Sequence, residues 1–168
     1  MHATRTQAVA APTAADAGSG SPGRPAGRLL EDSVQQGLNL FLALKNPAQM
    51  PALLASLDAL QPQVRAALSA LHYVHFARFL PSRDGSTLMV ITVFDGDLQS
   101  YLMDFVAVLG EVFTAILEFV RDAPRLPVSA YPQDFCEFVM KNNLRQVQPW
   151  AAYPSMTVLD ILQAQSRG

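Results

Sequence analysis

The chain has few charged residues and almost no cysteine. Of its 168 residues only 15% are charged, whereas about a quarter are charged in an average soluble domain. The single cysteine, Cys136, excludes an internal disulfide and a metal cluster built from cysteines. The formal net charge is -2 and no basic block occurs, so the charge gives no reason to expect nucleic acid as a partner. These features indicate a reducing compartment, and we expect a cytoplasmic protein.

Motifs for several common chemistries are also missing. The sequence contains no nucleophile elbow, no phosphate-binding loop and no dinucleotide glycine fingerprint after a strand. Its three histidines, His2, His72 and His75, do not have the spacing of a metal site. We therefore expect no protein-bound metal, and the sequence does not disclose a reaction.

Hydrophobic residues, in contrast, make up 50% of the chain. Either the core is large for this length, or a partner covers part of the apolar surface. The longest apolar stretch, 98–120, contains Asp104, Glu111 and Glu118. Each would cost about 2.5–3.5 kcal/mol near the centre of a bilayer, and their heptad spacing places them on one helix face. We therefore expect a buried helix with a solvated stripe and no membrane span.

The length suits one domain preceded by a tail. Residues 1–27 are mostly Ala, Thr, Ser, Gly and Pro, which favours a disordered tail, and residues 28–168 are expected to form a single domain. Arg5, Arg24 and Arg28, with few acids between them, leave organelle targeting as the less favoured alternative.

Hydrophobic periodicity predicts the first elements of that domain. Leu38, Leu40, Leu42 and Leu44 alternate with other residues, which predicts a strand. Asn46-Pro47 is typical of a helix start. A helix is expected over 50–71, and Pro62 is expected to split or kink it.

A hairpin and a long helix are predicted next. Strands at 72–80 and 86–95 flank Asp84-Gly85, which is a strong hairpin signal. The long helix covers 98–121, with Asp97 as its cap. A short amphipathic helix at 133–143 precedes an edge strand at 144–154 that contains Pro149. Residues 157–165 are left open between strand and helix.

The expected order is therefore strand, helix, strand, strand, helix, strand. This order is that of the ferredoxin-like βαββαβ fold, an α+β class with a four-stranded antiparallel sheet and helices on one face. The other face must meet water or a partner, and the high apolar fraction favours a partner. Two such sheets packed face to face would form a dimeric α+β barrel, so a homo-oligomer is expected.

Three segments carry a resemblance. "VHFARF", "FDGDLQSYLMDFV" and "PWAAYPSMTVLDI" resemble patterns in a poorly characterised group of bacterial proteins that are thought to be ferredoxin-like, of the dimeric α+β barrel kind. The resemblance covers about residues 38–161 and implies a fold but no established reaction. Dimeric α+β barrels include haem enzymes such as dye-decolourising peroxidases. Their Gly-x-x-Asp-Gly motif is absent here, so haem is implied by analogy of fold alone.

His75 and Arg78 are the chemically informative residues of the hairpin. In an unbulged strand they must lie on opposite faces, because successive side chains alternate. Arg78 is too strongly charged for a helix-packed core, so we place it on the open face, near Asp95 or an acidic ligand group. His75 would then lie under the helices as a hydrogen-bonded neutral ring. The alternative reverses the faces and makes His75 a base or a ligand in a pocket.

Other candidate residues are less specific. Asp95 and Asp97 flank Gly96 at a helix start, where capping is favoured over cation or phosphate binding. Trp150 and Tyr153, with Tyr131, form either the rim of a small-molecule cavity or anchors of a dimer interface. Phe41 faces away from the alternating leucines and is a further candidate ligand contact.

Two function classes follow. In the first, a small apolar molecule binds between the sheets of a dimer, with Arg78 orienting an acidic or carbonyl group and His75 acting as a candidate base in oxidative or isomerising chemistry. In the second, the open face is a non-catalytic surface for protein interaction or assembly. The residues do not decide whether the protein is an enzyme.

Overall fold

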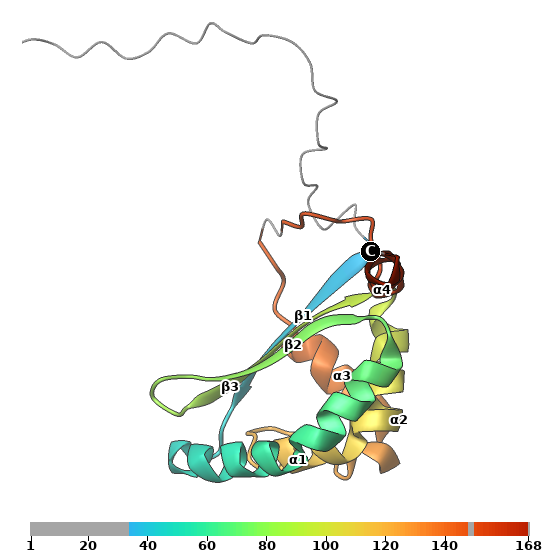
Figure 1. The fold of residues 1–168 in the computed structure, drawn as a ribbon. Coiled ribbons are helices and arrows are strands. Elements are labelled where there is room, and N and C mark those ends of the chain that lie inside the picture. The colour runs from blue at the N-terminus through green and yellow to red at the C-terminus, as the bar shows by residue number, and fades with distance from the viewer. Residues whose placement is uncertain (1–33, 148–149, 168) are drawn as a thin grey trace, which may run out of the picture.

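The computed structural model describes residues 34–147 and 150–167, which form an α+β fold. Its sheet has three antiparallel strands, β1 (Gln35–Ala43), β2 (Val74–Pro81) and β3 (Thr87–Asp95), in the order β1-β3-β2. Helices α1, α2 and α3 lie on one side of this sheet (Figure 1). The expected tail at 1–27 lies outside the described residues, as do residues 28–33 of the expected domain.

The alternation of leucines in β1 sets the two faces of the sheet. Leu38, Leu40 and Leu42 are buried, while Phe41 between them is exposed. In β3, Leu88, Val90, Thr92 and Phe94 are buried and alternate with half-buried residues. The predicted period of two is therefore confirmed, and it separates a face under the helices from an open face.

The β2–β3 hairpin turns where the sequence predicted. The Asp84 carboxylate accepts hydrogen bonds from the Ser82 hydroxyl at 2.6 Å and from the Ser86 amide at 3.1 Å. Gly85 has φ +70°, a left-handed conformation that glycine adopts at little cost.

Helix α1 (Met50–Leu71) follows a short 3-10 turn, η2 (Pro47–Gln49), that Asn46 caps by accepting the Ala48 amide at 3.0 Å. Pro62 lies inside α1, so the expected split into two helices is wrong. The buried side chains of α1 are Met50, Leu53, Leu57 and Val64.

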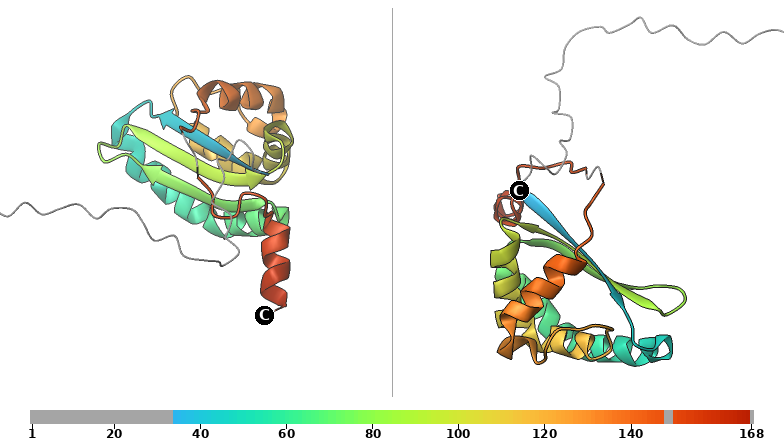
Figure 2. Two further views of the ribbon diagram at one scale, coloured as in Figure 1. Left: turned by 90° about the horizontal axis from the view of Figure 1, so that it is seen from above. Right: turned by 180° about the vertical axis from the view of Figure 1, so that it is seen from behind.

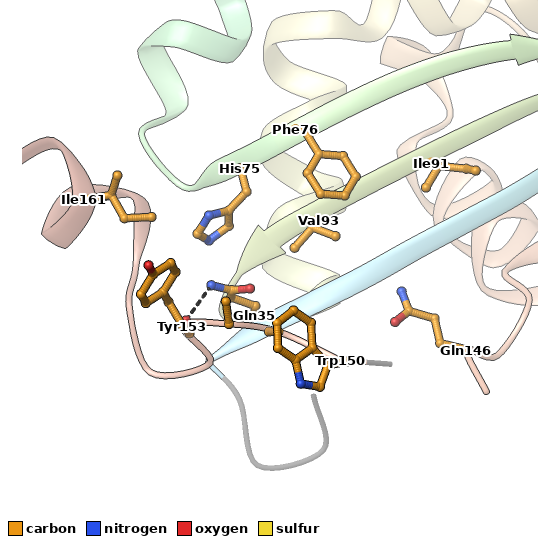
Figure 3. A pocket seen from close by; sticks show the side chains of 11 residues that line it. Gln35, His75, Phe76, Ile91, Val93, Gln146, Trp150, Tyr153 and Ile161 are labelled. Carbon is orange, nitrogen blue, oxygen red and sulfur yellow. Dashed lines mark hydrogen bonds between the residues drawn. The ribbon is translucent and has the colours of Figure 1, made fainter. Parts of the chain in front are cut away.

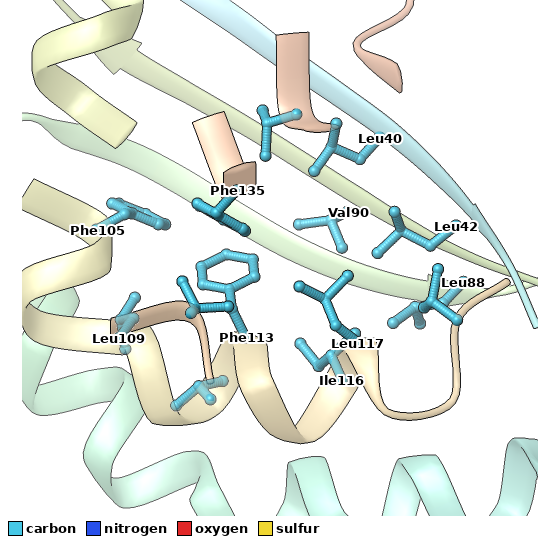
Figure 4. Close-up of a cluster of buried hydrophobic side chains, with 14 of the residues drawn as sticks. Leu40, Leu42, Leu88, Val90, Phe105, Leu109, Phe113, Ile116, Leu117 and Phe135 are labelled. Carbon is cyan, nitrogen blue, oxygen red and sulfur yellow. The ribbon is translucent and has the colours of Figure 1, made fainter. Parts of the chain in front are cut away.

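Helix α2 (Leu98–Leu117) forms the centre of the core. Asp97 caps it by accepting the Ser100 amide at 2.9 Å, as predicted. Ten of its residues are buried, and Phe105, Leu109, Phe113, Ile116 and Leu117 meet Leu40, Leu42, Leu88 and Val90 of the sheet (Figure 4). Asp104, Glu111 and Glu118 are exposed, which confirms the acidic stripe. By length and composition alone α2 could cross a membrane, but just over half of it is buried inside the domain.

A short 3-10 turn, η3 (Val128–Ala130), leads into helix α3 (Pro132–Asn142), which packs on α2 and beside β1. The strand expected at 144–154 is not formed among the described residues of that segment. Among the described residues, two isolated bridges, Leu40 with Asn143 and Leu44 with Val120, stand at the edge of β1 where a fourth strand would pair. Pro149 itself lies outside the described residues.

The chain then crosses to the far end of the sheet and forms α4 (Val158–Ser166). Thr157 and Asp160 form a capping box at its start, so the choice between strand and helix at 157–165 is settled as helix. Helix α4 has no buried residue and projects from the body of the domain (Figure 2).

Candidate functional site

The hairpin contains a β-bulge that decides where His75 lies. Val74 pairs with Phe94, whereas Phe76 pairs with Val93, so His75 is an extra residue between them. From Phe76 onward the pairing is regular, and Arg78 pairs with Ile91 on the open face. The bulge removes the alternation that would have placed His75 under the helices. His75 instead lines a pocket on the open face, together with Phe76.

His75 is paired with Asp95 of β3. The imidazole Nε2 lies 2.7 Å from Asp95 Oδ1, and the two side chains are only 12% and 10% exposed. A carboxylate accepts hydrogen bonds, so Nε2 carries the proton in this contact and Nδ1 is the acceptor nitrogen of the neutral ring. The arrangement is that of an imidazole whose tautomer is fixed by a neighbouring carboxylate.

Asp95 has a second role in the same site. Its other oxygen, Oδ2, accepts the Val158 amide at 2.7 Å, at the first residue of α4. One carboxylate therefore connects the histidine to the helix start. The negative charge of Asp95 lies at the positive N-terminal end of the α4 dipole, which strengthens this contact.

Gln35 holds the segment that precedes α4. Its side-chain amide nitrogen donates to the carbonyl oxygens of Tyr153 and Met156, both at 3.0 Å. The Val34 amide also donates to the Pro154 carbonyl at 3.0 Å. These contacts fix the C-terminal segment over one end of the open face.

The segment and the sheet together border an open pocket of about 510 Å³. Figure 3 shows His75 and Tyr153 at one end of it, Phe76, Ile91 and Val93 from the sheet, and Trp150 from the crossing segment. The remaining lining residues are Gln35, Gln146, Ala151, Ala152 and Ile161. The walls are mainly apolar and aromatic, and His75 is the one histidine among the described lining residues.

Gln146 lies directly over Gly37 of β1. A Cβ placed on Gly37 would meet Gln146 Nε2 at 1.4 Å. The absence of a side chain at Gly37 therefore creates the space in which the Gln146 amide rests against the sheet. The amide gives the pocket a neutral polar group that can donate and accept.

The predicted site residues are only partly brought together. His75, Trp150 and Tyr153 line the pocket, and Asp95 supports it from behind His75. Arg78 lies on the open face as expected, but its guanidinium stands 4.7 Å from the ring centroid of Phe76 and does not line the pocket. The expected contact of Arg78 with Asp95 is not formed.

Phe41 and Tyr131 lie elsewhere. Phe41 borders a separate hollow at the edge of β1. Tyr131 lies under Arg125, 4.4 Å from its guanidinium carbon, near the start of α3.

Sequence reasoning missed several residues of the site. Gln35, Phe76, Ile91, Val93, Gln146 and Ile161 line the pocket but were not singled out. The alternation in β3 could have suggested Ile91 and Val93, since it already placed them opposite the buried face. Nothing in the local sequence marks Gln35 or Gln146.

No family model, curated protein or solved structure gave a significant match to this chain.

The pocket suits a neutral ligand better than haem. The two carboxylates of haem need cationic or hydrogen-bonding partners, and no Lys or Arg lines the pocket among the described residues. The residues of this pocket therefore fit haem poorly. What the site offers is one acid–base pair beside an apolar, aromatic cavity.

Proposed function

We propose that the protein binds a small, mainly apolar molecule in the open-face pocket and works as a homodimer of the dimeric α+β barrel type. The observation that carries this proposal is the His75–Asp95 pair at the end of an apolar pocket of about 510 Å³. Pockets of this size, with few polar groups among apolar walls, are typical of small-molecule sites.

The open face supports the dimer. Phe41, Phe76 and Leu80 project from it and are 45%, 39% and 40% exposed. Contiguous exposed apolar side chains of this kind are typical of interaction surfaces. The ferredoxin-like classification is part of the proposal, because β3 lies between β1 and β2 as in a split βαβ arrangement.

The chemistry that fits best is proton transfer. His75, held by Asp95, would take a proton through Nδ1 from a carbon or hydroxyl of the bound molecule and return it at another position, which is an isomerisation. Gln146 and Tyr153 would orient a carbonyl or hydroxyl group. Arg78 stands at the outer side of Phe76, where it would meet an acidic substituent reaching out of the pocket.

A non-catalytic interaction module is the second candidate. The observation in its favour is that exposed apolar side chains continue beyond the pocket, at Met140, Leu144 and Val147. In that case the whole open face, with the C-terminal segment, would cover another protein.

Trp150 gives a direct experiment, because it is the only tryptophan and lines the pocket. Native mass spectrometry of the purified protein would report copy number and retained small molecules together. Titration of apolar carbonyl compounds, followed by Trp150 fluorescence, would then be repeated on His75→Gln, with His72→Gln as the matched control.

The proposal expects a dimer and a saturable change in Trp150 fluorescence when an apolar carbonyl compound binds. It also expects that turnover of the bound compound is lost in His75→Gln but not in His72→Gln. A monomer at all concentrations, or fluorescence that no compound changes, contradicts it. A changed copy number in Phe41→Ser or Leu80→Ser, with no small molecule ever bound, favours the interaction module.

A further inference from the structure

A second hollow, of about 320 Å³, lies at the outer edge of β1, away from the open-face pocket. It is bordered by the edge of β1, by the turn that follows α2 and by the C-terminal half of α3, which lies beside β1 (Figure 2). The residues that matter for the argument are Phe41, Arg121, Asp122, Phe138 and Lys141.

At the strand edge inside this hollow, backbone groups of β1 lack hydrogen-bond partners. The Leu44 amide donates to the Ser86 carbonyl, so the even-numbered residues of β1 turn their backbone groups toward β3 and the odd-numbered ones turn theirs outward. Phe41 therefore directs its N–H and C=O to the outer edge. No partner for them exists within 34–147 and 150–167.

The outward groups on either side of this stretch are occupied. Asn39 N–H donates to the Asn143 side chain at 2.9 Å, and its carbonyl accepts the Leu144 amide at 2.9 Å. On the other side the Ala43 carbonyl accepts the Arg121 amide at 2.8 Å. The gap thus runs only from the Phe41 N–H to the Ala43 N–H, which is too short for a paired strand but admits a small molecule.

Two cations border the gap and have no acidic partner. In the described part of the chain the ion pairs are His75 with Asp95 and Arg125 with Asp134, so neither Arg121 nor Lys141 is in an ion pair there. The Arg121 guanidinium makes one long hydrogen bond, to the Leu44 carbonyl at 3.5 Å. Asp122 contributes one negative charge, which leaves the hollow with a net charge of +1. Phe138, half-buried, supplies an apolar wall.

We propose that this hollow binds a small organic monocarboxylate. One carboxylate oxygen accepts the Phe41 amide, the other meets Arg121 or Lys141, and the apolar body lies against Phe138. A dianion such as phosphate fits less well, because Asp122 and the negative C-terminal end of the α3 dipole both oppose a second charge. The site is independent of the open-face pocket and of any activity there.

Benzoate is a suitable probe, with neutral benzamide and inorganic phosphate as comparisons. Binding is followed in the full chain by the backbone amide signal of Phe41 in ¹H–¹⁵N spectra. Amides of Ile91 and Val93 report the open-face pocket in the same spectra. Lys141→Met and Arg121→Met remove one cation each, and Arg65→Met removes an exposed cation of α1 as the matched control.

We expect benzoate to shift the Phe41 amide in a saturable way, and benzamide and phosphate not to. Each of the two hollow variants should weaken benzoate binding by about five-fold, the effect of losing one exposed charge contact, while Arg65→Met leaves it unchanged. The proposal is overturned if benzoate moves only the Ile91 and Val93 amides, if Arg65→Met weakens binding equally, or if phosphate binds in place of benzoate.

Discussion

Gln35 and Asp95 stand directly opposite each other on β1 and β3, and both side chains hold the C-terminal segment. Gln35 binds the carbonyls of Tyr153 and Met156, and Asp95 binds the amide of Val158. One cross-strand pair therefore positions the crossing segment and α4 as well as His75. The pocket exists because this pair brings the end of the chain back to the sheet.

The first prediction concerns Asp95→Ala. The change removes the acceptor of both His75 and Val158, so we expect α4 to leave the sheet and its amides to exchange faster by a factor that corresponds to about 1–3 kcal/mol. Hydrogen exchange of residues 158–166 checks this. Asp160→Ala, which breaks only the capping box, should fray α4 by about 1 kcal/mol and leave His75 in place. Unchanged protection of α4 in Asp95→Ala would contradict the role of this carboxylate.

A second prediction uses Gly37→Ala. Gly37 does not have a positive φ, so alanine is tolerated by the strand, and its Cβ displaces the flexible end of Gln146. We expect the free energy of unfolding to stay the same or to rise by about 0.5 kcal/mol, while the fluorescence of Trp150 and the affinity of any pocket ligand change. Gln146→Ala is the comparison, because it removes the Gln146 amide from this space without placing a Cβ there. A large loss of stability in Gly37→Ala would show that Gln146 is held more firmly than its position suggests.

The hairpin turn provides a prediction on pH. Hydrogen bonds from Ser82 and Ser86 lower the pKa of Asp84 from its ordinary value of 3.8 to about 2. Because the folded-state pKa is depressed, the contribution of Asp84 to stability is present above pH 4 and is lost as the pH falls toward 2. Asp84→Asn should therefore be less stable than the natural chain at neutral pH, and the difference should shrink between pH 4 and 2. Urea unfolding at each pH measures it, and a constant difference would be the opposing result.

The buried hydrogen bond between Tyr101 and Thr92 gives a double-mutant prediction. The Tyr101 hydroxyl donates to Thr92 Oγ1 at 2.8 Å, and its ring stacks on Phe94 at a centroid distance of 3.7 Å. Burial raises the pKa of Tyr101, so the hydroxyl stays protonated and donates throughout the accessible pH range.

Tyr101→Phe and Thr92→Val each leave one buried polar group without its partner and should each cost about 1–3 kcal/mol. The double variant should cost less than the sum of the two, because no orphan group remains. Urea unfolding of the natural chain, the two single variants and the double variant gives the four free energies of unfolding that the cycle compares. Strictly additive losses would mean that water replaces the missing partner.

Much of this architecture could be predicted from local signals. The leucine alternation, the Asp84-Gly85 turn, the Asp97 cap and the acidic stripe of α2 each depend on a few neighbouring residues, and all are found. Thr157 and Asp160 have the spacing of a capping box, so α4 could also have been predicted from the sequence.

The structural features that the sequence did not predict depend on tertiary context. Pro62 is accommodated within α1 because the packed helix tolerates one lost hydrogen bond. Residues 144–154 have the composition of an edge strand, yet Asn143 and Leu144 occupy only a short part of the edge of β1 before the chain leaves it. The bulge at His75 contains no glycine, and its partner Asp95 is twenty residues away, so the sequence did not reveal that His75 and Arg78 share a face.

The bulge also means that the proposed chemistry and the folding of the domain depend on different residues of β2. His75 is the one residue of that strand without a regular pairing partner, and the side chains of β2 that pack against the core are those of Val74 and Phe79. Deletion of this single position would restore an uninterrupted ladder and keep the hydrophobic interior, while removing the acid–base pair altogether. The strand could therefore gain or lose its reactive group by a one-codon insertion or deletion, without redesign of the scaffold that carries it.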